Sequence, residues 1–352
     1  LHQFDSKLNN VAAQQKNDLE ISSQNVNDIL TKLVGLNKVI GDDVGSRTNT
    51  GEYYGPNELL DQRNLLLDEL SRYGDTQVKQ NSDGTVTVNM SGHTVIDGEK
   101  KEILNFKSYS DGTVGLKWNS DGKRFSSPTG SLQGALDMIN GRGPYAQNAN
   151  ECAEKGILFF KDKINTFANT LASTFNNIIP GVDENGKPNF KQLLGARTVA
   201  EDGKVSVEGS LLVTAANISL STAWASDSNY VIFKAGDKDP KYANALSAAL
   251  TSNKQNFVFS GSSTNMTFEE FINDYVGICG SDHSFNGGRL DASAAIADDL
   301  LDRRDEISAV SPDEETANMM LYNKSYQAVA RLMTTLDEAL DILINRTGMV
   351  GR

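Results

Sequence analysis

The C-terminal stretch, residues 311–352, carries the most regular alternation of apolar and polar positions in the chain. Large apolar side chains recur there at alternating steps of three and four residues, which is the spacing of a coiled-coil seam. The seam consists of Met319, Tyr322, Tyr326, Val329, Met333, Leu336, Leu340 and Leu343. The pattern predicts one long C-terminal helix whose seam must be covered by another helix, because a lone helix cannot bury it.

Helix boundary signals flank this seam. Ser311 suits the N-cap, Pro312 suits the first helical position, and Glu314 stands three residues after the cap, as in a capping box. The acidic residues 313–315 place negative charge at the positive end of the helix dipole. Thr347-Gly348 supplies a C-cap. The whole seam is therefore expected to lie within one uninterrupted helix.

A second long helix is predicted near the N-terminus, over residues 4–40. Gly41 ends it, and its apolar stripe again steps by three and four residues. The stripe runs through Leu19, Ser22, Val26, Ile29, Leu33, Leu36 and Ile40. Two seams of nearly matched length at the two ends of one chain indicate that these helices pack side by side.

A third helix is predicted over residues 56–73, and from Asp75 the period of the pattern changes to two. Turn sequences rich in Asn, Asp and Gly separate the short alternating segments that follow. The segments predicted as strands are 76–80, 85–90, 102–106 and 113–118. Residues 76–126 are therefore expected to form an antiparallel meander that lies outside the helical bundle and contributes little to assembly.

The rest of the chain alternates between helical and irregular patterns. A short amphipathic helix is predicted over 130–141, and a fourth long helix over 150–179 ends at Pro180-Gly181. Residues 181–235 return to strands and turns, with 204–209 and 230–233 as the clearest strands. Further helices are expected over 240–251, 267–279 and 290–307, the second opened by the capping pair Thr267 and Glu270.

These elements place the chain in a mainly α class with β insertions, or α+β. The expected architecture is an elongated bundle of long heptad-patterned helices with antiparallel β-rich inserted domains. Three parts belong to the bundle: residues 1–75, residues 131–180, and residues 287–352 with the terminal helix. Residues 76–130 are expected to be a β-rich insertion, and residues 181–286 a mixed insertion with short helices.

The composition of the chain argues against several kinds of partner and site. The 352 residues include 33 Lys and Arg against 46 Asp and Glu, so the net charge is −13 and a nucleic-acid partner is not expected. No uninterrupted apolar run approaches 18 residues, so we expect no membrane insertion. Two distant cysteines make neither a disulfide framework nor a zinc spacing. Because the chain opens with Leu1 and shows no signal peptide, we take it to be a fragment or processed form that begins inside a helix.

No motif in the sequence is strong evidence of a catalytic, metal or cofactor site. Residues 181–187 have the spacing of a phosphate-binding loop, but Pro188 replaces the required Ser or Thr, so a plain turn is favoured. None of the three histidines has a ligand at metal-binding spacing. The acids at 313–315 are more typical of dipole partners than of an acid–base cluster. No nucleophile elbow, zincin motif or dinucleotide fingerprint is present. We therefore expect no catalytic, metal or cofactor site.

Two motifs resemble the flagellar hook-associated protein family that joins hook to filament. The first is Pro56-Asn57-Glu58-Leu59-Leu60-Asp61-Gln62-Arg63, similar to the signature of that family. The second is the acidic start of the C-terminal helix followed by residues 326–331 and 340–345, which rod and hook proteins share. By this resemblance, we expect the family's N-terminal portion with its terminal helix to be absent from this chain.

The resemblance implies a structural adaptor at the hook–filament junction of the bacterial flagellum. Such a protein is exported through the type III pathway without a cleaved signal, and its location is extracellular. Its expected partners are copies of itself, neighbouring hook and filament-side junction proteins, and an export chaperone on the C-terminal helix. Without the family's N-terminal helix, Leu336, Leu340 and Leu343 are expected to be exposed or to pack against another copy.

Two other functions stay open at this point. A flagellin-like filament subunit or a hook protein would share the C-terminal motif, although the motif around Leu59 and Arg63 argues against both. An enzyme carried on a flagellar scaffold would need a nucleophile or metal motif in the insertions, and the sequence offers none.

Overall fold

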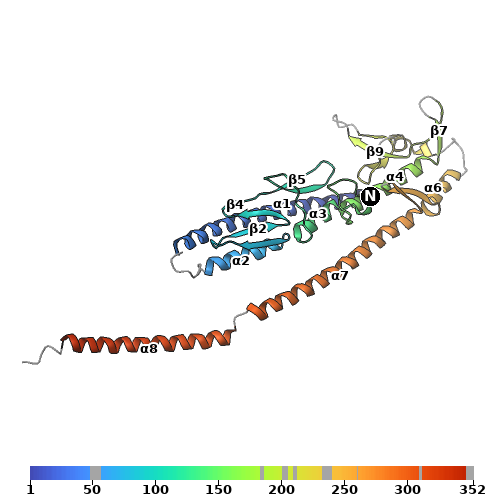
Figure 1. The fold of residues 1–352 in the computed structure, drawn as a ribbon. Helices are drawn as coiled ribbons and strands as arrows, with labels where there is room; N and C mark the ends of the chain where they lie inside the picture. Colours follow the sequence, from blue (N-terminus) through green and yellow to red (C-terminus); the bar gives the residue numbers. More distant parts are fainter. Residues whose placement is uncertain are drawn as a thin grey trace, which may run out of the picture. The chain divides into compact units, whose positions relative to one another are not determined.

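The computed structural model describes residues 1–47, 57–182, 186–199, 205–208, 212–231, 240–259, 261–308 and 311–345. The chain divides into two compact units, Leu1–Tyr275 and Val276–Arg352. The first unit holds the sheets and most helices, and the second consists of helix (Figure 1). The predicted class, mainly α with small antiparallel sheets, is confirmed.

The N-terminal helix α1, His2–Arg47, has the predicted stripe buried along one face. Leu19, Val26, Ile29, Leu33 and Ile40 are each at most 3% exposed. The face packs against α2 (Asn57–Ser71), against α3 and against strands of the neighbouring sheets, as Figure 1 shows. The predicted pairing of this seam with the C-terminal helix is therefore wrong, because the sheets and the two short helices already cover the apolar side of α1.

The predicted meander is confirmed as two antiparallel sheets. The first has the order β1-β2-β3-β4, with β1 Thr76–Gln80, β2 Val86–Met90, β3 His93–Asp97 and β4 Lys100–Lys101. The second pairs β5 Leu104–Ser108 with β6 Val114–Trp118. Strand β3 was not predicted, because its short segment lies between two turns and offers too few alternating positions.

These strands lie in the main hydrophobic core rather than outside the helices. Val88, Ile96, Leu116 and Trp118 are buried in one cluster with Leu30 of α1 and with side chains of α2 and α3. The expectation that residues 76–126 form a separate appendage is therefore wrong. The physical reason is that the inner faces of the strands, together with α2 and α3, cover the apolar side of α1.

Four asparagine side chains on helices pair with the backbone of strand residues. Each carboxamide accepts from a strand N–H and donates to the carbonyl of that residue, so that it imitates a neighbouring strand. The oxygen-to-N–H and amide-to-carbonyl distances are 2.8 and 2.9 Å for Asn27 with Leu104, and 2.8 and 2.9 Å for Asn140 with Val114. Asn37 with Val86 and Asn176 with Leu194 repeat the pattern.

Helix α3, Ser131–Asn140, is confirmed, and α4, Ile157–Asn176, begins later than predicted. The segment before α4 contains the 3₁₀ turn η1, Gly143–Tyr145, and a loop. The Glu151 carboxylate holds this loop by accepting from the backbone N–H groups of Gln147 and Asn148. Gly141 and the residue before α4 approach so closely that a Cβ on Gly141 would lie 2.4 Å from the backbone N of Gly156.

The second β-rich region surrounds the end of α4. It contains β7 Pro180–Val182 paired with β8 Pro188–Phe190, and a sheet of order β10-β9-β11 built from Val205–Glu208, Leu194–Val199 and Ile218–Leu220. Ala168 and Ala172 of α4 pack against Ala196 and Val213. The predicted strand at 230–233 is wrong where described, since Tyr230 and Val231 belong to the 3₁₀ helix η2, Ser228–Val231. Residues 232–233 lie outside the described residues.

The last part of the first unit contains α5 Thr222–Ser226, α6 Lys241–Thr251, and the hairpin of β12 Gln255–Phe259 with β13 Ser262–Met266. Helix α7, Phe268–Ser308, starts with the predicted capping pair: Glu270 N–H donates to Thr267 Oγ1 at 3.1 Å, and Thr267 N–H donates to the Glu270 carboxylate at 2.8 Å. An aromatic cluster of Phe167, Phe257, Phe268 and Phe271 fixes this start against α4.

Helix α7 continues without a break through residues 280–290, so the predicted separate helices at 267–279 and 290–307 are one element. The glycines at 277–288 lie inside the helix. After it comes α8, Pro312–Asn345, which confirms the predicted C-terminal helix. In the described part of the chain, no helix is both long enough and apolar enough to cross a membrane.

Candidate assembly surface

Ser311 caps the start of α8, as its sequence predicts. The backbone N–H of Glu314 donates to Ser311 Oγ at 3.5 Å, and the N–H of Glu315 donates to the Ser311 carbonyl at 3.0 Å. Asp313, Glu314 and Glu315 occupy the first turn. Their negative charge meets the positive end of the helix dipole, which stabilises the helix start and explains the acids without a catalytic role.

The predicted seam of α8 is exposed wherever its side chains are described. Exposure ranges from 51% for Leu336 and 52% for Leu340 to 75% for Tyr326. The other described seam members, Met319, Tyr322, Val329 and Met333, lie between these values. The side chain of Leu343 and the predicted C-cap at Thr347-Gly348 lie outside the described residues. The role of the seam in assembly stays a prediction.

One further apolar side chain of α8 widens this surface beyond the seam, and others are exposed elsewhere on the helix. Met320, Leu321, Leu332 and Ile342 are between 51% and 61% exposed. Leu332 stands three residues after Val329 and four before Leu336, so it lies beside the seam on the same side of the helix. The heptad spacing alone missed Leu332, because only a wider stripe of the type found on core-facing helices includes it.

Several polar side chains of α8 form hydrogen bonds within the helix. The hydroxyls of Thr316, Ser325 and Thr334 donate to the carbonyl four residues earlier, at 2.6, 2.8 and 3.0 Å. The Gln327 amide donates to Asn323 Oδ1 at 3.0 Å. A partner that covers the apolar side of α8 therefore need not supply hydrogen bonds to these groups. Its association would be favoured by the burial of apolar surface.

The signature motif on α2 divides into a buried and an exposed part. Arg63 is 5% exposed, and its Nη1 donates to the carbonyl of Gly84 at 2.8 Å, in the turn between β1 and β2. Leu59 and Leu60 are half-buried, whereas Asp61 and Gln62 are exposed. Pro56 and the side chain of Asn57 lie outside the described residues. Arg63 thus stabilises the fold by joining α2 to the first sheet.

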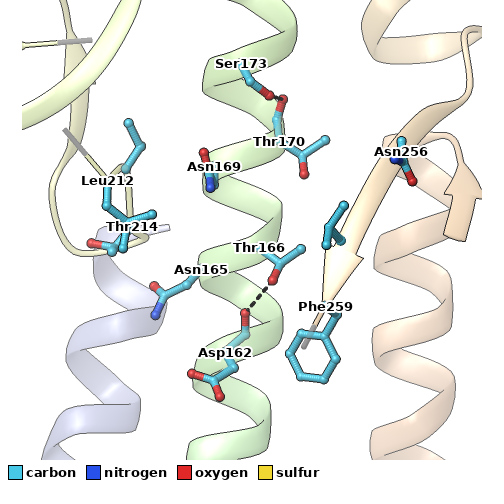
Figure 2. Close-up of a pocket in the computed structure, with 12 residues that line it drawn as sticks. Asp162, Asn165, Thr166, Asn169, Thr170, Ser173, Leu212, Thr214, Asn256 and Phe259 are labelled. Atoms are coloured by element: carbon cyan, nitrogen blue, oxygen red, sulfur yellow. Dashed lines mark hydrogen bonds between the residues drawn. The ribbon is translucent and has the colours of Figure 1, made fainter. Parts of the chain in front are cut away.

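A polar cleft of about 520 Å³ runs along α4 (Figure 2). Its floor is the α4 side formed by Asp162, Asn165, Thr166, Asn169 and Thr170. Figure 2 shows the segment with Leu212 and Thr214 on one side of α4 and strand β12 with Asn256 and Phe259 on the other. Sequence analysis missed the cleft, although the polar positions of α4 also recur at steps of three and four residues.

Asp162, which lines the cleft, also belongs to an ion cluster. Arg142 lies between two carboxylates, with its Nη1 3.2 Å from Glu151 Oε1 and its Nε 3.4 Å from Asp162 Oδ2. Burial raises the pKa of the Asp162 carboxyl, and the Arg142 charge opposes this rise only in part. Burial would also raise the pKa of Glu151, but hydrogen bonds from Gln147 and Asn148 and the charge of Arg142 lower it below the ordinary value.

The cleft offers hydrogen bonding but no assembled catalytic group. Its floor has amides and hydroxyls beside a single carboxylate, Asp162, which faces Arg142. Among the described residues, no group of three His, Cys, Asp or Glu side chains stands where it could hold a metal ion. Burial raises the pKa of the Cys152 thiol to about 11, so this sulfur is protonated at neutral pH and is a poor nucleophile.

Comparisons with known proteins agree with these features. The model of the flagellar hook-associated protein FlgK helical domain matches residues 1–191, and the C-terminal model of the flagellar basal body rod FlgEFG proteins matches residues 303–346. Flagellar hook-associated protein 1 of Bacillus subtilis (strain 168) is 29% identical, over 98% of this chain and 68% of the relative. Its namesake in Salmonella typhimurium (strain LT2) is 23% identical, over 91% and 69%.

One solved structure, that of the flagellar hook junction protein FlgK from Burkholderia pseudomallei, is also similar. The match has 22% identity and a TM-score of 0.40, and it covers 56% of this chain and 34% of that one. The chain thus spans about a third of the solved relative. Because the family model covers residues 1–191, more than half of the 352 residues, the chain belongs to the family of flagellar hook-associated proteins named FlgK and is a structural protein of the flagellum.

Proposed function

We propose that this chain is an adaptor subunit at the hook–filament junction, which assembles by burying the exposed apolar side of α8 against helices of neighbouring subunits. The single observation that carries the proposal is this side of α8, whose described seam residues are all at least 51% exposed. The match of residues 303–346 to the C-terminal model of rod proteins supports it, because that match contains the same seam.

The proposed mechanism is apolar burial with a register set by the heptad spacing. Burying one large apolar side chain is worth roughly 1.5–3 kcal/mol, so the seam supplies a strong and non-directional attraction. Knobs-into-holes packing at alternating steps of three and four residues then fixes the axial register of the two helices. Repetition of one contact by the symmetry of a ring would extend it around the junction.

The proposed partners follow the family. They are copies of this chain, the neighbouring proteins on the hook and filament sides, and an export chaperone that covers α8 before secretion. The proposed location is the extracellular hook–filament junction, reached without a cleaved signal peptide. Nucleic acid and membrane insertion have no place in this function, and we assign the chain no catalytic activity.

The filament or hook subunit is a weaker alternative. The rod and hook model covers only residues 303–346, whereas the hook-associated model covers residues 1–191 with the α2 signature and the first sheet. A role as a filament or hook subunit would explain the match of residues 303–346, but it would not explain the match of residues 1–191. The enzyme alternative finds no support in the relatives, which are named flagellar hook-associated protein 1.

A strain lacking this gene tests the proposal. Electron microscopy of negatively stained cells should show hooks without attached filaments, with filament protein released into the medium. Complementation with the parent gene should restore filaments, and complementation with a Leu340→Asp gene should not. Filaments that form normally in the deletion strain would contradict the adaptor function.

A further inference from the structure

Residues 277–288 of α7 have a composition that opposes helix formation. The segment contains Gly277, Gly280, Gly287 and Gly288, and each glycine in a helix interior costs about 1 kcal/mol relative to alanine. Most of the remaining positions are Ser, Asp, His and Asn, whose side chains favour caps and turns over helix interiors. The segment is nevertheless helical in the structure.

Packing does not explain these glycines. A Cβ added at any of the four would meet nothing within 4 Å. This contrasts with Gly141, where a Cβ would lie 2.4 Å from a backbone nitrogen. None of the four has a positive φ, so alanine could adopt the same backbone. Within the structure, therefore, neither close approach nor backbone geometry requires glycine here.

The flanks of the segment are much better supported. On its N-terminal side, Phe268 and Phe271 are buried in the aromatic cluster, and Lys163 Nζ pairs with Asp274 at 2.8 Å. On its C-terminal side, residues 292–301 include four alanines and two leucines, which are strong helix formers. The boundary between the two compact units falls after Tyr275, directly before the glycines. Most of the intervening side chains are exposed.

We infer that residues 277–288 are a helix–coil switch built into α7. In the free chain the segment opens locally, because its exposed hydrogen bonds do not offset the conformational entropy of glycine. It becomes a stable helix only when another surface covers it. The inference rests on composition and environment and does not depend on the proposed function.

Hydrogen exchange of the whole chain in dilute solution, followed peptide by peptide with mass spectrometry, tests the switch. Amides of 277–288 should exchange far faster than those of 292–301, although both segments are helical and exposed in the structure. The fourfold variant with Gly277, Gly280, Gly287 and Gly288 changed to Ala should slow exchange in this segment. A factor of about five for each substitution gives a combined slowing of roughly 10²–10³-fold.

Matched controls are the variants Gly35→Ala in α1 and Gly134→Ala in α3, two helical glycines that also have open space at the Cβ position. Each lies in the packed first unit, so neither should alter exchange in 277–288. Far-ultraviolet circular dichroism should show a gain of helix for the fourfold variant and none for the controls. Exchange in the parent as slow in 277–288 as in 292–301, or a fourfold variant with unchanged exchange, would overturn the inference.

Discussion

The side-chain amide of Asn37 and the backbone of Val86 exchange two hydrogen bonds inside the first unit. Val86 N–H donates to Asn37 Oδ1 at 3.0 Å, and Asn37 Nδ2 donates to the Val86 carbonyl at 2.8 Å. Asn37 is fully buried and Val86 is 2% exposed. The first residue of β2 thus finds on α1 the partner that a further strand would otherwise provide, which is why this sheet belongs to the helical core.

Changing Asn37 to Ala should destabilise the chain severely. The substitution leaves a buried N–H and a buried carbonyl of Val86 without their partner, at about 1–3 kcal/mol for each group. Urea unfolding followed by circular dichroism measures the loss of unfolding free energy. The exposed Asn25 on the same helix supplies the control, since Asn25→Ala should change stability by less than about 0.5 kcal/mol. Equal losses of unfolding free energy in the two variants would show that the paired hydrogen bonds between Asn37 and Val86 do not stabilise the fold.

This contact shows what a sequence pattern can and cannot predict. Apolar residues that recur at steps of three and four over long stretches predicted α1, α4 and α8, because such a sustained period is a strong signal of a helix. The cover of the α1 stripe was predicted wrongly, since an apolar stripe does not say whether a helix or a sheet buries it. A usable signal was present: Asn37 stands four residues after Leu33 and three before Ile40, so a polar side chain occupies the middle of a buried stripe.

Among the candidate sites, too, some features could be predicted from the sequence and others could not. The seam of α8 could be predicted because its spacing is local to one helix. The polar cleft on α4 could not, since it needs β12 and the 212–214 segment to come alongside from distant parts of the sequence. The continuity of α7 could not be predicted, because the segment at 277–288 contains four glycines, and glycine lowers helix propensity without forbidding helix.

Arg63 is predicted to be a folding residue within the signature motif. Its change to Ala removes a charged hydrogen bond to the Gly84 carbonyl and the packing of a nearly buried side chain, so unfolding free energy should fall by about 2–3 kcal/mol. The neighbouring exposed Gln62→Ala should change it by less than about 0.5 kcal/mol. Differential scanning calorimetry of both variants measures this. If Arg63→Ala keeps the parent melting temperature, Arg63 serves a partner instead of the fold.

The loop before α4 should become less stable in acid through Glu151. Because the pKa of this carboxyl lies below its ordinary value of 4.5 in the folded chain, its contribution to stability is complete above 4.5 and is lost as pH falls through the lower folded value. Glu151→Gln should therefore be less stable than the parent at pH 7, by about 1–3 kcal/mol, and the difference should shrink below pH 4.5. Urea titrations from pH 7 to pH 3 measure the difference.

The exposed Glu154, three residues further on, is the matched control for that series. Glu154→Gln should follow the parent at every pH. A difference between Glu151→Gln and the parent that stays constant down to pH 3 would contradict the assigned direction of the pKa, because it would show that the carboxylate charge has no part in the effect.

The central claim, that the apolar side of α8 is an assembly surface, is tested most directly by Leu340→Asp. Leu340 is 52% exposed, and one such leucine buried in a contact is worth about 1.5–3 kcal/mol. Sedimentation velocity over a concentration series should show self-association weakened at least about tenfold. Thr335→Asp is the control, since it adds the same charge about 140° round the helix. The account predicts weakened association for Leu340→Asp alone, with the melting temperature of the monomer unchanged in calorimetry. A large fall in monomer melting temperature with unaltered association would show that the seam is ordinary core and would contradict the account.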